Sequence, residues 1–242
     1  YTNNISVEGG NEKVNYRLSY ANTYIDGYVP TNVINRNNFN LRTQAKITDK
    51  FSLDAKVNYI MQDATNRPTL SDASDNPAYL LISQPRSIPM DIMSQYKWTA
   101  NDVAKQLGYT NVFAGLEKTY ATNSSTANPY WTINETKNTD RRDRVIGFLR
   151  LSYDFAPWLK LTATGGTDFY TDQRLRYRAV NTYQSLNRKG DMSETVIRVR
   201  EDNYDALLNS NFKLDNGLGF TINVGASHLS RYLRQTGNSG SQ

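Results

Sequence analysis

The residues from Val14 to Tyr24 alternate between apolar or aromatic side chains and polar or small ones. The same two-residue period returns in residues 39–47 and 51–59. Successive side chains of a β-strand point to opposite faces of the sheet, so this period predicts strands whose two faces meet different environments. One face is apolar and the other is polar. The polar positions include Arg17, Arg42, Lys46, Asp54, Lys56 and Asn58.

The length of these runs separates two kinds of all-β protein. A soluble sandwich also alternates, so the period alone does not distinguish water from lipid outside the strand. A tilted strand needs about 9 to 11 residues to cross a bilayer, whereas strands of globular proteins average about 5 to 6 residues. The runs match the longer value, and the charges of the polar face suit a water-filled lumen. The pattern therefore favours a transmembrane β-barrel over a soluble all-β fold.

The overall composition is compatible with this fold. With 242 residues, 38% of them hydrophobic, and a mean hydropathy of −0.67, the chain has the average polarity of a soluble protein. A membrane barrel has the same average, because only alternate strand residues face lipid and the loops are polar. A stretch of about 18 apolar residues is absent from the sequence, which excludes a transmembrane helix.

The ionisable residues exclude several classes of site. The chain has no cysteine and a single histidine, His228, so disulfides, thiolate metal sites and histidine clusters are ruled out. The net charge of +5 is spread along the chain, with a local basic run only at residues 141–144. Nucleic-acid binding requires a concentrated basic patch. We therefore predict no metal, no cofactor and no nucleic-acid partner.

Turn signals and long connections alternate along the chain, and together they predict eight strands. Short turns are expected at residues 9–12, 48–50, 154–157 and 215–217, and long connections at 25–36, 62–140 and 171–195. This alternation of connection lengths is typical of outer-membrane barrels, which have short periplasmic turns and long extracellular loops. Aromatic residues flank the short turns, as expected of an interfacial girdle or, in a soluble sheet, of hydrophobic clamps at hairpin ends. They are Tyr16, Phe51, Tyr153, Phe155, Trp158, Phe212 and Phe220.

The region 62–140 is predicted to be a long extracellular loop region that folds into a compact cap, because structureless loops longer than about 12 to 15 residues are uncommon. Residues 99–107, closed by Gly108, and residues 78–81 after Pro77 have helical signals. Aromatic rings of this region can stack on sugars, contact a partner protein, or form a small core of their own. The residues nominated for contact with substrate or with a lid are Tyr96, Trp98, Tyr109, Tyr130 and Trp131.

Two blocks of residues resemble the SusC/RagA family of TonB-linked outer-membrane proteins. The first block comprises Gly9, Gly10, Val14, Asn15, Tyr16, Ser19, Gly27, Arg36, Phe39, Leu41 and Arg42. The second comprises Asn128, Pro129, Tyr130, Trp131, Arg142, Asp143, Arg144, Ile146, Gly147, Tyr153, Asp154, Phe155, Trp158, Leu159, Gly166, Asp168, Phe169 and Tyr170. The blocks occur in the family's order, and the resemblance covers roughly residues 5–232.

The resemblance implies the rest of the assembly. Family members have a barrel of about 22 strands with an N-terminal plug and a TonB-binding segment. Neither the plug nor the TonB box is visible in residues 1–242, and residues 237–242 read as a loop, so we expect an internal portion of the barrel. The implied function is active import of an oligosaccharide or a peptide across the outer membrane. The implied partners are a SusD-like surface lipoprotein and TonB, with a dimer of SusC–SusD pairs as an option.

Two other classes of function remain open from the residues alone. An enzyme would need a base beside a nucleophile, or paired carboxylates, and the sequence offers only His228 and the pairs Asp202/Asp205 and Asp72/Asp75. These carboxylates are expected in loops or near strand ends, so no catalytic residue is predicted. The alternative to transport is a soluble or membrane-anchored β-protein that binds glycans, such as an adhesin.

Overall fold

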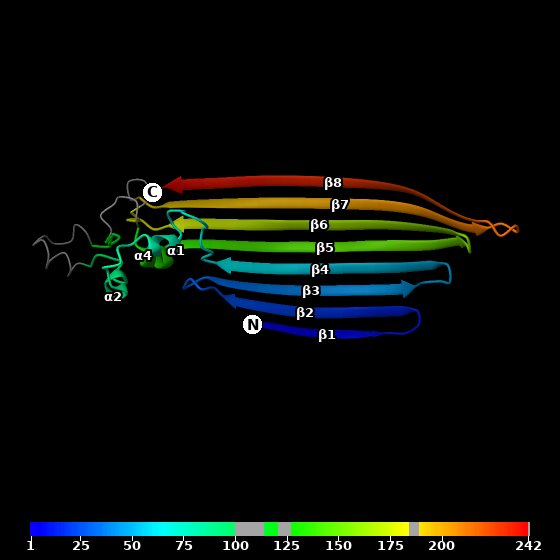
Figure 1. The fold of residues 1–242 in the computed structure, drawn as a ribbon, viewed down its shortest axis with the longest axis horizontal. Helices are drawn as coiled ribbons and strands as arrows, with labels where there is room; N and C mark the ends of the chain where they lie inside the picture. The colour runs from blue at the N-terminus through cyan, green and yellow to red at the C-terminus, as the bar shows by residue number, and fades with distance from the viewer. Residues whose placement is uncertain (100–113, 121–126, 184–188, 242) are drawn as a thin grey trace, which may run out of the picture.

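The computed structural model describes residues 1–99, 114–120, 127–183 and 189–241. Within these ranges the strands form a single eight-stranded sheet in which each strand pairs antiparallel with the next (Figure 1). The strands are β1 (Thr2–Gly10), β2 (Val14–Asp26), β3 (Val33–Lys46), β4 (Phe51–Thr65), β5 (Thr136–Ala156), β6 (Leu159–Arg178), β7 (Asp191–Lys213) and β8 (Gly219–Ser241). The described helices are α1 (Pro77–Ile82), α2 (Met90–Met93) and α4 (Pro129–Glu135). The prediction of eight antiparallel strands is confirmed.

The two ends of the sheet differ in their connections. Short turns join β1 to β2, β3 to β4, β5 to β6 and β7 to β8 at one end, on the right of Figure 1, which we call the turn end. The longer connections and all the described helices lie at the opposite end, which we call the loop end (Figure 1). The predicted alternation of short and long connections is therefore confirmed.

The strands extend further toward the loop end than the sequence predicted. The connections predicted at 25–36, 62–140 and 171–195 shrink to residues 27–32, 66–135 and 179–190, and residues 237–241, predicted as a loop, continue β8. The physical reason is visible in many of the added strand residues, which are polar on both faces, for example Thr136 to Asp140 in β5. A strand in water on both sides keeps its backbone pairing without an apolar period, so its sequence resembles that of a loop.

The register places the alternating side chains on two consistent faces. Leu18 pairs with Leu41 and Leu41 with Val57, while their neighbours Arg17, Arg42 and Lys56 align in the adjacent row. Because the pleat sends successive side chains to opposite sides, these two rows lie on opposite faces of the sheet. We call the face of Leu41 the outward face and the face of Arg42 the luminal face.

An apolar belt covers the outward face over the length that a membrane requires. On β5 it runs from Val145 to Tyr153, with Leu149 in its centre, and these side chains are partly or fully exposed. Nine residues match the span of a tilted transmembrane strand, which is about 9 to 11 residues. Since exposed apolar side chains on this scale are unfavourable in water, the belt is a lipid-facing surface.

Aromatic rings border the belt on both sides. At the turn end, Phe51 and Tyr153 lie 6.5 Å apart between ring centroids and Phe212 and Phe220 lie 5.5 Å apart, which confirms where the sequence placed aromatic residues. A second border, which the sequence analysis missed, begins with Tyr20 and Phe39, 4.8 Å apart, and continues to Tyr59. Two borders of amphipathic rings are typical of the two interfaces of a bilayer.

We predict that Leu149→Arg destabilises the barrel of the full-length protein by about 2 to 4 kcal/mol, because a charge would enter the lipid at the middle of the belt. Arg150→Leu is the matched control, since Arg150 faces the lumen and its Nε donates a hydrogen bond of 3.3 Å to Thr164. Reversible folding into lipid vesicles measures both variants. Equal sensitivity at the two positions would contradict the assignment of the faces.

Candidate functional site

Charged side chains on the luminal face of β5 and β6 form an ordered network. Arg144 binds Asp168 through two hydrogen bonds, from Nε at 2.8 Å and from Nη2 at 2.5 Å. Asp172 accepts from Nη2 of Arg142 at 2.6 Å and from Nη2 of Arg174 at 2.8 Å. Arginine and carboxylate groups paired in this way are geometrically fixed as well as mutually neutralised.

Tyr170 connects the two halves of this network. Its ring centroid lies 5.0 Å from the guanidinium carbon of Arg142 and 5.8 Å from that of Arg144. The Asp172 side chain is only 4% exposed, whereas its two arginines keep 37% and 50% of their surface. We call the set Arg142, Arg144, Asp168, Tyr170, Asp172 and Arg174 the luminal ladder. It presents guanidinium groups and one aromatic face to the lumen on a rigid base.

The luminal face stays polar toward the turn end. Arg17, Arg42 and Lys56 lie side by side on three neighbouring strands, and Asp54 pairs with Arg42 at 3.2 Å. Such a surface cannot face hydrocarbon, because unpaired cations in lipid carry a large desolvation cost. The luminal face therefore lines an aqueous space.

The described residues 66–99, 114–120 and 127–135, between β4 and β5, fold into a cap at the loop end. Asn76 caps α1 and Asn128 caps α4, each with its side-chain oxygen accepting a backbone N–H, and each is followed by proline. The predicted helical turn at 78–81 is confirmed within α1. The same asparagine–proline signal precedes α4, which the sequence analysis missed. The predicted helix at 99–107 lies outside the described residues from position 100 onward.

Asn128 holds several segments of the cap together. It is 1% exposed, and its Nδ2 donates to the carbonyls of Met93 at 3.0 Å and Lys118 at 2.9 Å. Its backbone N–H donates to Oε1 of Glu117 at 2.6 Å, and its Oδ1 accepts from the N–H of Tyr130 at 2.9 Å. One buried amide thus connects three parts of the cap that are distant in sequence.

Trp131 forms the centre of the small core of the cap. It is 1% exposed, its Nε1 donates to Oγ1 of Thr182 at 2.9 Å, and Tyr96 packs edge-on with ring centroids 6.1 Å apart. Lys97 lies 5.4 Å from the Trp131 ring centroid and pairs with Glu135 at 2.7 Å. In this conformation the Trp131 side chain is not accessible to a ligand. It belongs to a small core of the cap, which is the alternative to ligand contact that the sequence left open.

The other nominated aromatic residues are placed differently. Tyr96, Trp98 and Tyr130 are half-buried, and Nζ of Lys118 lies 4.8 Å from the Trp98 ring centroid. Tyr109 lies outside the described residues. Contact of these side chains with substrate or a lid stays a prediction, and the structure brings Tyr96 and Trp131 together while Trp98 and Tyr130 make other contacts.

Two ion pairs tie the cap to the luminal face. Asp75, which is buried, pairs with Arg176 of β6, and Arg67 pairs with Asp140 of β5 at 3.1 Å. Both strand partners lie on the luminal face by the register of β5 and β6. The cap is therefore attached on the luminal side of the loop end, near the luminal ladder. This connection was not predicted from the sequence, since ion pairs between residues 73 and 101 positions apart leave no local signal.

The candidate catalytic pairs are not assembled. Asp202 and Asp205 lie on opposite faces of β7 by the pleat, and Asp75 is bound by Arg176 and by Thr69 at 2.7 Å while Asp72 is exposed. His228 lies in β8 opposite Tyr204. Within the described ranges, three or more acidic or histidine side chains are nowhere grouped so as to hold a metal ion. The helices found in those ranges are too short or too polar to span a membrane.

We predict that Asn128→Ala loosens the cap by about 1 to 3 kcal/mol, because it removes a helix cap and leaves buried hydrogen-bond partners unpaired. Hydrogen exchange of residues 114–120 and 127–135 in the full-length protein should accelerate while the strands keep their protection. Asn134→Ala is the matched control, since Asn134 is exposed and its Nδ2 donates within its own helix, to the carbonyl of Tyr130 at 2.7 Å. Unchanged exchange in Asn128→Ala would show that this amide does not hold the cap.

Comparisons with known proteins find the same fold among solved structures. Protein-family models and curated proteins give no match. Among solved structures, the chain is similar to the RagAB peptide importer in its "open-open" state, with a TM-score of 0.64 and 17% identity over 99% of this chain. It is also similar to BauA, the ferric preacinetobactin receptor from Acinetobacter baumannii, with a TM-score of 0.53 and 12% identity over 98% of this chain.

The likeness concerns part of each of these proteins. The chain spans 25% of the length of the RagAB chain and 29% of that of BauA. At identities this low the structural similarity shows the fold alone, and the residues of each site are argued separately. The chain thus has the fold predicted from its sequence, an antiparallel segment of an outer-membrane β-barrel of the kind found in the RagAB importer.

Proposed function

We propose that this chain forms part of the wall of an outer-membrane, TonB-dependent importer. The observation that supports this most strongly is the division of one sheet between an apolar belt outside and a fixed charged network inside, with a folded cap attached at the luminal loop end. A passive adhesin has no need of an organised polar lumen, whereas a transporter needs one to guide a polar substrate. The role is transport and not catalysis.

We further propose that the substrate is a short peptide, with an oligosaccharide as the second candidate. The luminal ladder offers arginine donors and the face of Tyr170, which suit the carboxylates and carbonyls of a peptide chain. The RagAB structures, to which the fold is similar, are described as those of a peptide importer. Oligosaccharides would rely more on stacking, for which the ladder contains one ring.

The other components of the transport complex are proposed from the resemblance to SusC/RagA proteins. A SusD-like lipoprotein would close over the cap, where Tyr96, Trp98 and Tyr130 keep part of their surface. TonB would act on a plug supplied by another part of the protein. Pairs of such complexes would dimerise through surfaces that the described residues do not define.

Uptake in cells tests the central proposal. Cells producing the full-length protein should take up a fluorescent oligopeptide mixture in a TonB-dependent manner, and deletion of TonB should abolish that uptake. A labelled oligosaccharide mixture is run in parallel to separate the two substrate classes. Accumulation that does not depend on TonB would contradict the import proposal, and uptake of the sugar alone would contradict the peptide assignment.

We predict that replacing residues 90–120 by a short Gly/Ser linker leaves membrane insertion intact and weakens association with the lipoprotein. The hydroxyl of Tyr120 donates to the carbonyl of Ile92 at 2.7 Å, so the two ends of this segment are close enough for a short linker. The belt makes its backbone bonds between strands and does not include the cap. Co-purification of the lipoprotein measures the effect. Loss of the inserted barrel would show that the segment is required for folding.

A further inference from the structure

Three arginines gather on the outward face of β7 and β8, where a lipid-facing surface would be expected to end. Arg198 lies directly opposite Arg234 in the register, and Arg200 follows on the same face two residues along β7. Side chains directly opposite on antiparallel strands have Cβ atoms about 4.5 to 5.5 Å apart, and like charges at that spacing destabilise a sheet. The arrangement therefore needs an explanation beyond folding.

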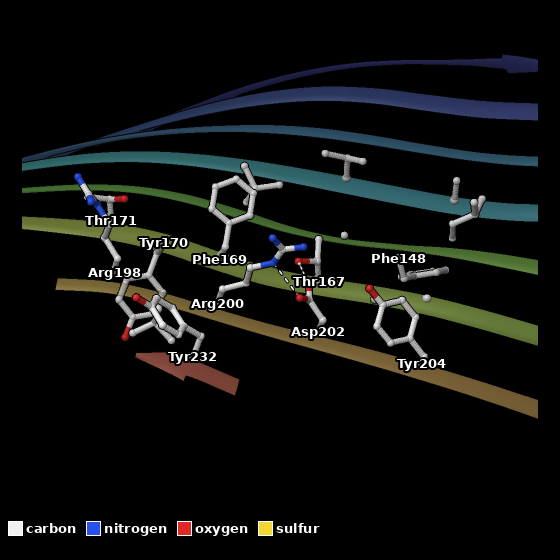
Figure 2. Close-up of a pocket in the computed structure, with 18 residues that line it drawn as sticks. Phe148, Thr167, Phe169, Tyr170, Thr171, Arg198, Arg200, Asp202, Tyr204 and Tyr232 are labelled. Atoms are coloured by element: carbon white, nitrogen blue, oxygen red, sulfur yellow. Dashed lines mark hydrogen bonds and ion pairs between the residues drawn. The ribbon is translucent and has the colours of Figure 1, made fainter. Parts of the chain in front are cut away.

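The arginines are only partly neutralised by the protein. Arg200 pairs with Asp202 at 2.8 Å, and Asp202 also accepts a hydrogen bond of 2.7 Å from Thr167 (Figure 2). Across the part of the chain that the structure describes, Arg198 and Arg234 have no acidic group within 4.0 Å, and both are exposed. Asp143, the acidic residue of the same outward row, already pairs with Arg141 at 3.2 Å. Two positive charges thus remain uncompensated on this face.

The depth of the arginines follows from the belt on their own strands. Counting from the turn end, the outward residues of β7 are apolar or aromatic for most of the run from Phe212 to Tyr204, and Asp202, Arg200 and Arg198 come next. On β8 the outward residues Phe220 to Ala226 are apolar or aromatic, the polar His228 and Ser230 follow, and Arg234 comes after Tyr232. The cluster begins where the belt ends on the loop side, which is the level of lipid headgroups.

A groove in the belt adjoins the cluster. It has a volume of about 780 Å³ and is lined mainly by outward residues of β4 to β7, among them Val57, Val145 and Leu149. Gly147 and Gly165 contribute no side chains to its lining, and the rings of Phe169 and Tyr204 also border it (Figure 2). Arg198, Arg200 and Tyr232 also line it. A single ligand can therefore reach both the apolar floor and the arginines.

We propose that this surface binds a phosphorylated lipid of the outer leaflet, with a headgroup phosphate held by Arg198, Arg200 and Arg234 and an acyl chain lying in the groove over Gly147 and Gly165. Guanidinium groups bind phosphate through paired, charge-assisted hydrogen bonds. The proposal rests on the membrane orientation of the proposed function. Asp202 is a positioning residue, since it fixes Arg200 at the border of the belt.

A second copy of the chain fits this surface less well. It would have to present acidic groups to the arginines at the same depth, and the outward residues Asp143 and Asp202 are already paired within the chain. An amphiphile with an anionic head and an apolar tail matches both the charge and the groove. We therefore take the lipid as the occupant and treat self-association as an outcome of the test.

Native mass spectrometry of the full-length protein in detergent tests the assignment. The probes are bisphosphorylated lipid A, the same lipid A after enzymatic removal of its phosphates, and inorganic phosphate. The variant Arg198→Gln/Arg200→Gln/Arg234→Gln should bind bisphosphorylated lipid A about tenfold more weakly, or worse, because charged hydrogen bonds to the phosphate are lost. The control Arg17→Gln/Arg42→Gln/Lys56→Gln removes three luminal charges and should bind it normally.

A second variant tests the groove independently of charge. A Cβ atom at Gly165 would meet the Tyr204 ring at 3.5 Å, an ordinary contact, so Gly165→Ala should fold and should weaken binding by narrowing the groove. Binding that survives removal of the lipid phosphates, or survives in the triple variant, would overturn the proposal. So would displacement of the lipid by inorganic phosphate alone, or a protein dimer that the triple variant abolishes without lipid. TonB-dependent uptake is measured separately, so a failure of lipid binding leaves the import proposal standing.

Discussion

The whole structure depends on the strict alternation of side chains along paired strands that pass between water and lipid. In hydrocarbon every backbone N–H and C=O must find a partner within the protein, and a sheet meets that demand only by pairing strand to strand. The register from β1 to β8 does so without interruption except for the irregularity near Asp154. Because the pairing also fixes which side chains share a face, a slip of one residue would send Arg42 and Lys56 into the lipid.

This constraint is readable in sequence, which explains why the fold was predicted well. Alternation identified the strands, and glycine, aspartate and proline at the short turns gave the connections. Prediction failed where the constraint is relaxed. Beyond the belt both faces of β5 to β8 are in water, so residues such as Asp140 and Gly237 carry no apolar period although they belong to strands. The backbone continues to pair there, but with water on both faces the side chains need not alternate between apolar and polar.

The features of the candidate site also differ in whether a local sequence signal predicts them. Local signals identified α1, and the same signal at Asn128 and Pro129 was available for α4. Contacts between distant segments had no signal: the bond from Trp131 to Thr182 joins two connections at the loop end, and the pair of Asp172 with Arg142 depends on the register of β5 against β6. The nominated aromatic residues therefore separate into a buried core residue, Trp131, and partly exposed ones such as Trp98, a distinction that composition does not make.

The most direct test of the account is the environment of adjacent side chains on one strand. Spin labels attached in the full-length protein at Leu18, Val57 and Leu161 should collide with oxygen dissolved in the bilayer, and labels at Arg17, Lys56 and Lys160 should collide with a water-soluble nickel complex. The register and the pleat assign these two sets to opposite faces. If the first set reported water and the second a dry environment, or if the two sets did not differ, the division between lipid and lumen would be wrong.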